Sequence, residues 1–218
     1  MNPPLELTSD AIRAAHASLP KAFRDTPQFV HEGLSARLRV PVVVKVETTN
    51  PIGSFKGRGT WVAVHALAGE GTIGSGRPIV CVSAGNFGQG VAYAARALGV
   101  PAIVFCSTRA NRGKVERMRA LGADVIETGD DFDAARGASE AYVATHDAEL
   151  LVDGDDVRIS TGAATLAVEV TDAVEAGDLP DLAVASIPVG NGALINGVAS
   201  WWRASAPGLR VQIGRAHV

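Results

Sequence analysis

Short apolar runs alternate with amphipathic segments from Pro78 onward, and this alternation is the clearest pattern in the chain. Four of the runs read as strands buried on both faces, because their residues are continuously apolar. They span residues 79–82, 102–105, 124–126 and 150–152. Alanine-rich segments with helical periodicity separate them, at about 88–98, 112–121 and 132–145. This order of strands and helices predicts a parallel sheet with right-handed crossovers.

Further elements flank this unit on both sides. Before it, the sequence predicts a β-branched strand, a turn and a helix, at 42–46, 50–53 and about 55–67. After it, the sequence predicts a helix, a strand and a second helix, at about 162–176, 182–187 and 194–204. We therefore expect an α/β fold with two parallel-sheet lobes. A smaller lobe over 76–154 is inserted into a larger, discontinuous lobe over 1–75 and 155–212.

Composition and charge narrow the class of partner. The chain has 218 residues, of which 47% are hydrophobic and 20% charged, so it can bury a substantial core. Its net charge is only −3, and basic residues are scattered among acidic ones. No surface basic enough to attract nucleic acid or anionic lipid is expected, which leaves a small molecule as the default partner.

The sequence gives no sign of secretion or of a membrane segment. Residues 1–19 lack the basic start and apolar middle of a signal peptide, and no apolar run approaches the roughly 20 residues of a membrane helix. Cys81 and Cys106 lie inside apolar strand-like runs, at a spacing that fits no metal motif. We expect reduced, buried thiols, no metal site and a cytoplasmic location.

Three short segments carry candidate chemistry, and each follows an apolar strand, where open α/β sheets place their ligands. The first is Ser54-Phe55-Lys56-Gly57-Arg58-Gly59. A lysine at the start of a helix lies near its positive end, and burial also disfavours the charged amine, so Lys56 would be a better nucleophile at neutral pH. The alternative is that Ser54 simply caps the helix and Lys56 is solvated.

The second segment is the turn Ser83-Ala84-Gly85-Asn86-Phe87-Gly88. Its small residues let backbone amides reach a ligand, and the free N–H groups of the following helix suit an anion such as a substrate carboxylate. The Asn86 amide could point at a cofactor oxygen. Taken alone, the turn could equally be a helix cap without a ligand.

The third segment is the glycine loop Pro188-Val189-Gly190-Asn191-Gly192-Ala193-Leu194. Its glycines allow consecutive N–H groups to converge on a phosphate at a helix N-terminus, without a cationic side chain. A lone glycine loop is a weak signal. This one lacks both the Gly-x-Gly-x-x-Gly spacing of a dinucleotide site and the Gly-Lys-Ser/Thr ending of a P-loop.

Together, in this order and spacing, the three segments resemble the fold-type II pyridoxal phosphate (PLP) enzymes, which share the fold of the tryptophan synthase β chain. The resemblance covers about residues 42–206 and implies PLP as the cofactor. In that family the lysine of the S-F-K-x-R-G motif forms the Schiff base with PLP, and it corresponds to Lys56. The asparagine of S-x-G-N contacts the PLP phenolic oxygen and corresponds to Asn86.

The same resemblance implies the remaining site residues. The substrate carboxylate pocket is lined by Ser83, Ala84 and Gly85. The loop that holds the phosphate consists of Gly190, Asn191, Gly192, Ala193 and Leu194. Asn191 and Ala193 interrupt what is often an unbroken glycine run, and Phe87 stands where dehydratases frequently carry histidine.

The chain is most similar to the threonine/serine dehydratases of that family. Gly57 follows the lysine where threonine synthases tend to have aspartate, and Ser83 opens the asparagine turn where cysteine synthases typically have threonine. The resemblance implies β-elimination of L-threonine or L-serine to a 2-keto acid and ammonia. Threonine synthase-like or other β-replacement chemistry remains an alternative, as does a degenerate PLP-binding module that is not an enzyme.

Position 84 separates elimination from racemisation. In the serine racemases of this family a serine hydroxyl at the second position of the asparagine turn reprotonates Cα. The residue here is Ala84, which has no proton to give, so elimination without racemisation is expected.

Family members continue well beyond residue 218, so we expect the larger lobe to be incomplete and the complete enzyme to be a homo-oligomer. After the strand-like run 209–212, residues 213–218 look like the translation of a sequencing adapter. We set them aside as a non-native tail, and His217 is given no role.

Overall fold

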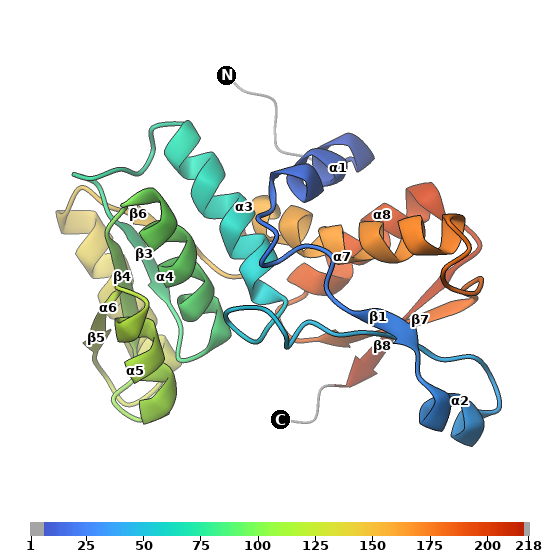
Figure 1. Cartoon of the computed structure of the whole chain (residues 1–218). Coiled ribbons are helices and arrows are strands. Elements are labelled where there is room, and N and C mark those ends of the chain that lie inside the picture. The colour runs from blue at the N-terminus through green and yellow to red at the C-terminus, as the bar shows by residue number, and fades with distance from the viewer. Residues whose placement is uncertain (1–6, 216–218) are drawn as a thin grey trace. The chain divides into compact units, whose positions relative to one another are not determined.

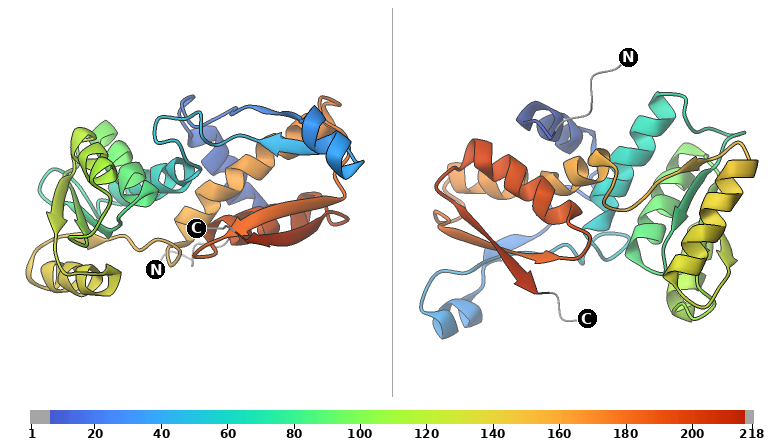
Figure 2. Two further views of the ribbon diagram at one scale, coloured as in Figure 1. Left: turned by 90° about the horizontal axis from the view of Figure 1, so that it is seen from below. Right: turned by 180° about the vertical axis from the view of Figure 1, so that it is seen from behind.

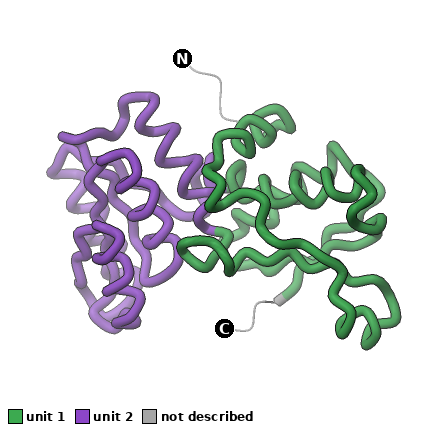
Figure 3. The backbone as a smooth tube through the Cα atoms, in the orientation of Figure 1, with its two compact units in different colours: residues 1–55, 160–218 green, residues 56–159 purple. Residues whose placement is uncertain are grey.

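The structure is a computed structural model that describes residues 7–215 (Figure 1). The chain divides into two compact units, an inner one of residues 56–159 and a larger one built from the residues before and after it (Figure 3). No helix within 7–215 combines the length and the apolarity that crossing a membrane requires. The two units are described in turn.

A four-stranded parallel sheet forms the centre of the inner unit, in the order β5-β4-β3-β6. Its strands are β3 (Ile79–Val82), β4 (Ala102–Cys106), β5 (Asp124–Glu127) and β6 (Glu149–Leu150). All of β4 and the first three residues of β3 are buried, as continuous apolar runs predict. The predicted parallel sheet is therefore confirmed, and the carboxyl ends of its strands lie at one edge.

Three crossover helices cover this sheet: α4 (Asn86–Leu98), α5 (Arg112–Ala120) and α6 (Phe132–Thr145). One face of the sheet, with Val80, Ile103 and Phe105, packs against the α6 residues Tyr142 and Val143. On the other face α4 lies close to β4, because a Cβ at Gly88 would be 3.1 Å from a methyl group of Val104. The helix ends follow local signals, with Gly99 in the left-handed conformation after α4 and Asp131 capping α6.

Helix α3 (Lys56–Gly69) also belongs to the inner unit, whereas the sequence analysis assigned it to the larger lobe. The reason is a close helix crossing. A Cβ at Gly90 of α4 would lie 2.4 Å from the Thr60 hydroxyl oxygen, so glycine lets α3 and α4 touch. The inner unit of the structure therefore spans residues 56–159, and the lobe boundaries expected from the sequence, 76 and 154, stay a prediction.

The larger unit combines helices with two short sheets (Figure 2). Its elements are α1 (Ser9–Ser18), β1 (Gln28–Val30), α2 (Glu32–Leu38), β2 (Val43–Lys45), most of α7 (Val157–Glu175), β7 (Val184–Val189), α8 (Ala193–Ser205) and β8 (Arg210–Arg215). Strands β7 and β8 are parallel, as expected for this lobe, and β2 pairs antiparallel with the additional short strand β1.

The core of the larger unit lies where α7 and α8 cross. A Cβ at Gly197 would lie 2.2 Å from the Ser160 carbonyl oxygen, so the two helices approach at backbone distance. Both tryptophans of α8, Trp201 and Trp202, donate their indole N–H to the Thr171 hydroxyl, at 3.0 and 3.2 Å. Buried polar groups are thus paired within an otherwise apolar helix interface.

Residues 213–215, which the sequence analysis set aside, continue β8 opposite residues 187–189 of β7. Backbone pairing makes no demand on side-chain identity, so the proposed non-native origin of 213–218 stays a prediction. Residues 216–218, with His217, lie outside the described residues.

Candidate active site

Lys56 is the first residue of α3 and is reached through a turn that Asn50 holds together. The Asn50 side chain donates to the Glu47 and Ser54 carbonyls at 2.8 and 2.9 Å, and it accepts from the Ile52 and Ser54 N–H groups, each at 3.2 Å. A turn between β2 and the helix of Lys56 is what the sequence predicted. The Asn50-Pro51 pair predicts a turn from the sequence, but the four hydrogen bonds of the Asn50 side chain are seen only in the folded structure.

The Lys56 ammonium group is ion-paired. Its Nζ lies 2.8 and 2.7 Å from the two carboxylate oxygens of Asp153, and 5.9 Å from the centre of the Phe87 ring. The Lys56 side chain is only 16% exposed, so Lys56 is not the solvated lysine that helix position alone allows. Asp153 was missed by the sequence analysis. It follows β6, which pairs in parallel with β3, and so it lies at the carboxyl edge of the inner sheet.

The asparagine turn connects β3 directly to α4, as predicted. The Ser83 side chain is buried, and its hydroxyl accepts a hydrogen bond from the Gly85 N–H at 3.0 Å. The Ser83 N–H in turn donates to the Phe105 carbonyl of β4. Ser83 therefore shapes the turn, and one of the amides that the sequence left for a ligand is already occupied.

Other groups of this turn are available. Ala84 is exposed, Asn86 is half-buried, and across residues 7–215 the Asn86 side-chain amide makes no hydrogen bond. Helix α4 starts at Asn86 without a side-chain cap from Gly85, and the first amides of a helix have no intrahelical acceptor. The Lys114 ammonium nitrogen would be 3.7 Å from a Cβ at Gly85. This arrangement of amides and one cation suits an anion.

The glycine loop lies in the larger unit, between β7 and α8. Gly192 has a φ of 93°, which favours glycine, and α8 has no side-chain cap from it. The Asn191 carbonyl oxygen of the side chain accepts from the Ala193 N–H at 3.2 Å. The side chains of Ala193 and Leu194 are buried, so these residues can reach a ligand only through their backbone.

The two cysteines are free and buried, as predicted. Burial raises the pKa of the Cys81 thiol far above its usual range, and the Asp153 carboxylate adds to the effect. Burial also raises the pKa of Cys106, with a further contribution from Glu127. Both thiols are thus poor nucleophiles at neutral pH.

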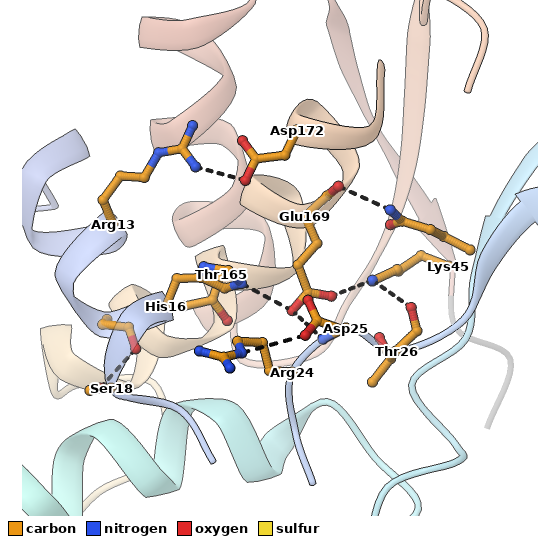
Figure 4. Close-up of polar contacts among 12 residues, drawn as sticks. Arg13, His16, Ser18, Arg24, Asp25, Thr26, Lys45, Thr165, Glu169 and Asp172 are labelled. Carbon is orange, nitrogen blue, oxygen red and sulfur yellow. Dashed lines mark hydrogen bonds and ion pairs between the residues drawn. The ribbon is translucent and has the colours of Figure 1, made fainter. Parts of the chain in front are cut away.

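A second polar cluster lies in the larger unit (Figure 4), where ligand atoms of His16, Asp25 and Glu169 come within 4.8 Å of one another. Such a set could hold a cation, but Lys45 already donates to Glu169 in a close ion pair. Asp25 also donates its N–H to Glu169 at 3.1 Å. The Glu169 carboxylate therefore already has Lys45 and the Asp25 backbone as partners, whereas Asp25 itself is exposed.

Comparison with known proteins identifies the family. The model of the pyridoxal-phosphate dependent enzyme family matches residues 19–215, and the chain belongs to this family. An L-threonine ammonia-lyase of Geobacter sulfurreducens is 32% identical over 200 residues, which are 92% of this chain and 48% of that enzyme. The chain spans about half the length of the curated relatives it matches.

Solved structures share the fold. A threonine deaminase of Solanum lycopersicum superposes with a TM-score of 0.83 at 28% identity, over 94% of this chain and 58% of that one. Maize serine racemase superposes with a TM-score of 0.85 at 26% identity, over 94% and 60%. The α/β fold class of the fold-type II PLP enzymes is thereby confirmed.

The groups present fit the family's cofactor. Lys56 offers a shielded amine at the edge of the inner sheet, and the Asn86 amide has no other partner within the described range. In the larger unit, the space next to Gly190 is open, since a Cβ at this position would meet no atom within 4 Å. This open space and the N-terminus of α8 suit a phosphate.

Proposed function

We propose that the protein is a PLP-dependent lyase that eliminates the β-hydroxyl of L-threonine or L-serine to give a 2-keto acid and ammonia. The observation that carries the proposal is Lys56 at the carboxyl edge of the inner sheet, beside the ring of Phe87 in the asparagine turn. The 32% identity to an L-threonine ammonia-lyase supports this reaction over the others that the fold hosts.

The residues divide the work as follows. PLP, when bound, supplies an electron sink for the charge left on the substrate. Lys56 would hold the cofactor covalently and then move the Cα proton as a base. The Asn86 amide would orient the cofactor, and the α4 amides next to Ala84 and Gly85 would hold the substrate carboxylate.

The glycine loop would hold the cofactor phosphate through backbone N–H groups. Its members in this role are Gly190, Asn191, Gly192, Ala193 and Leu194. Because no lysine or arginine belongs to the loop, binding would depend on the helix N-terminus of α8.

Racemisation is the second candidate, because maize serine racemase shares the fold. Ala84 argues against it, since a methyl group cannot return a proton to Cα. β-Replacement and a non-catalytic PLP-binding module are the remaining alternatives.

The test combines spectroscopy with product analysis on the full-length protein. We expect visible absorbance from a lysine–PLP bond, and 2-oxobutyrate and ammonia from L-threonine. Absorbance without turnover of any hydroxy amino acid supports the binding module, and D-serine from L-serine at a rate comparable to pyruvate supports a racemase. Absence of the absorbance contradicts the assignment of Lys56.

A further inference from the structure

We propose that Asp153 is the counter-charge of Lys56 and orients its Nζ during proton transfer. The inference rests on the proposed function, because it assigns a positioning residue to that same site. Neither the motif of the lysine nor that of the asparagine turn includes Asp153.

The contact between the two side chains is bidentate. Both carboxylate oxygens of Asp153 lie within hydrogen-bond distance of one nitrogen, at 2.8 and 2.7 Å. The side chains are 16% and 23% exposed, so solvent screens the pair less than it screens a surface ion pair. A charge-assisted pair of this geometry fixes the direction in which the Lys56 nitrogen points.

The backbone places Asp153 where the chemistry is expected. Residues Ile79 and Val80 of β3 pair in parallel with Glu149 and Leu150 of β6, and the Leu151 N–H donates to the Val80 carbonyl at 2.8 Å. The segment that carries Asp153 therefore leaves the sheet at the same edge as the asparagine turn. Lys56 is the first residue of α3, and its ion pair with Asp153 connects this helix to the edge of the sheet.

The proposed elimination puts a positive charge on Lys56 and removes it again. The neutral Nζ takes the proton from the substrate Cα, and the C–H electron pair remains with the substrate. When the bond from Cβ to the hydroxyl oxygen breaks, the ammonium returns the proton to the hydroxyl, which leaves as water. Between these events the ammonium donates to the Asp153 carboxylate, which stabilises the charged base without itself gaining a proton.

The closest comparison within the chain is Lys114. Lys114 is exposed, and its ammonium group makes no ion pair or hydrogen bond with any residue from 7 to 215. It therefore provides an internal reference for the reactivity of an unpaired lysine. Asp155, exposed and two residues beyond Asp153, provides a matched control for the loss of a carboxylate from the same segment.

The first experiment measures lysine acylation in the cofactor-free, full-length protein. An N-hydroxysuccinimide ester is added at fixed pH, and the peptides that contain Lys56 and Lys114 are quantified by mass spectrometry. In Asp153→Asn we expect Lys56 to react about 10-fold faster relative to Lys114, because its nitrogen is no longer engaged in a charge-assisted pair with a carboxylate. Asp155→Asn should leave the ratio unchanged. A Lys56 rate that is equal in Asp153→Asn and wild type overturns the inference, whatever the activity.

The second experiment uses the PLP-loaded enzyme. Asp153→Asn should lower kcat about 10- to 100-fold while KM for L-threonine changes little, and Asp153→Glu should recover part of the loss. A rise in KM at constant kcat overturns the role in proton transfer. If wild type turns over no substrate while Asp153→Asn still speeds acylation of Lys56, the proposed function fails and the pairing stands.

Discussion

Two lysine–carboxylate pairs, one in each unit, show how the same chemistry serves different ends. In the larger unit, Lys45 and Glu169 are 10% and 4% exposed, and Lys45 also donates to the Thr26 carbonyl at 2.9 Å (Figure 4). Glu169 has two more neighbours, since it accepts from the Asp25 N–H and lies 3.4 Å from His16 Nε2.

The pair in the inner unit is set differently. Lys56 and Asp153 are more exposed than Lys45 and Glu169, and they lie at a sheet edge next to the turn of Asn86, whose side-chain amide makes no hydrogen bond with residues 7–215. A buried network in which each charge has several partners is rigid and ties elements together. A pair at an open edge can exchange its partners, which is what a base must do. The difference in surroundings therefore separates a structural pair from the pair that we propose takes part in catalysis.

The largest expected effect comes from removing the lysine of the edge pair. Lys56→Ala should abolish the visible absorbance of PLP bound covalently to the protein, because the bond forms at its amine. Absorbance spectra of the two proteins after dialysis against PLP measure the effect, and Lys21→Ala, at an exposed lysine, is the control. An unchanged band in Lys56→Ala would show that another lysine carries the cofactor.

Breaking the buried pair should instead reduce stability. Glu169→Ala leaves the Lys45 ammonium buried without its carboxylate, and we expect a loss of about 3–5 kcal/mol in the free energy of unfolding. Urea titration measures it. Replacing both partners, as Lys45→Met with Glu169→Leu, should cost less than Glu169→Ala alone. If the double variant is less stable than Glu169→Ala, the loss of stability in Glu169→Ala does not come mainly from the unpaired charge of Lys45.

A smaller change in reaction products is expected from a substitution in the asparagine turn. Ala84→Ser adds a hydroxyl to the asparagine turn, and we expect the ratio of D-serine to pyruvate formed from L-serine to rise about 10-fold, since a positioned acid speeds proton return. Chiral chromatography gives the ratio, and Ala84→Val controls for added bulk. A wild-type enzyme that already makes D-serine as fast as pyruvate would contradict the argument from Ala84.

The smallest effect on stability is expected for an ion pair that is exposed and lies outside the proposed site. Arg13 and Asp172 lie 2.8 Å apart but are 45% and 42% exposed, and Arg13 also lies 4.8 Å from the centre of the Trp201 ring. Arg13→Ala should cost at most about 1 kcal/mol in the free energy of unfolding, partly screened by salt. Urea titrations at low and high salt test this, and a loss comparable to that of Glu169→Ala would overturn the ranking by burial.

The inner sheet could be read from the sequence because its strands are buried on both faces. Continuous apolar runs and terminal glycines suffice there, and the predicted helix over 132–145 is confirmed at both ends. The short strand β1 was missed because its three residues are identified only by their pairing with β2. The packing of α3 against Gly90 likewise has no local signature in the sequence.

The site was predictable only as far as its motifs extend. Lys56 and the asparagine turn lie in segments with recognisable spacing, but Asp153 lies in the run Asp153-Gly154-Asp155-Asp156, where nothing local distinguishes one carboxylate from another. Asp156 pairs with Arg158 and Asp155 is exposed. The parallel pairing of β6 with β3 places the segment, and only its folded conformation shows that Asp153 is the residue that contacts Lys56.

The hydrogen bond from the Ala193 N–H to the Asn191 side chain has a consequence for how the glycine loop would bind a phosphate, as we propose it does. An amide oxygen is a neutral acceptor, whereas a phosphate oxygen is charged and accepts more strongly. The Asn191 side chain therefore occupies the Ala193 N–H until a phosphate binds. Rotation of the Asn191 side chain would free this N–H for the phosphate. The loop would therefore be preorganised, because binding a phosphate requires a side-chain rotation and no refolding of the backbone.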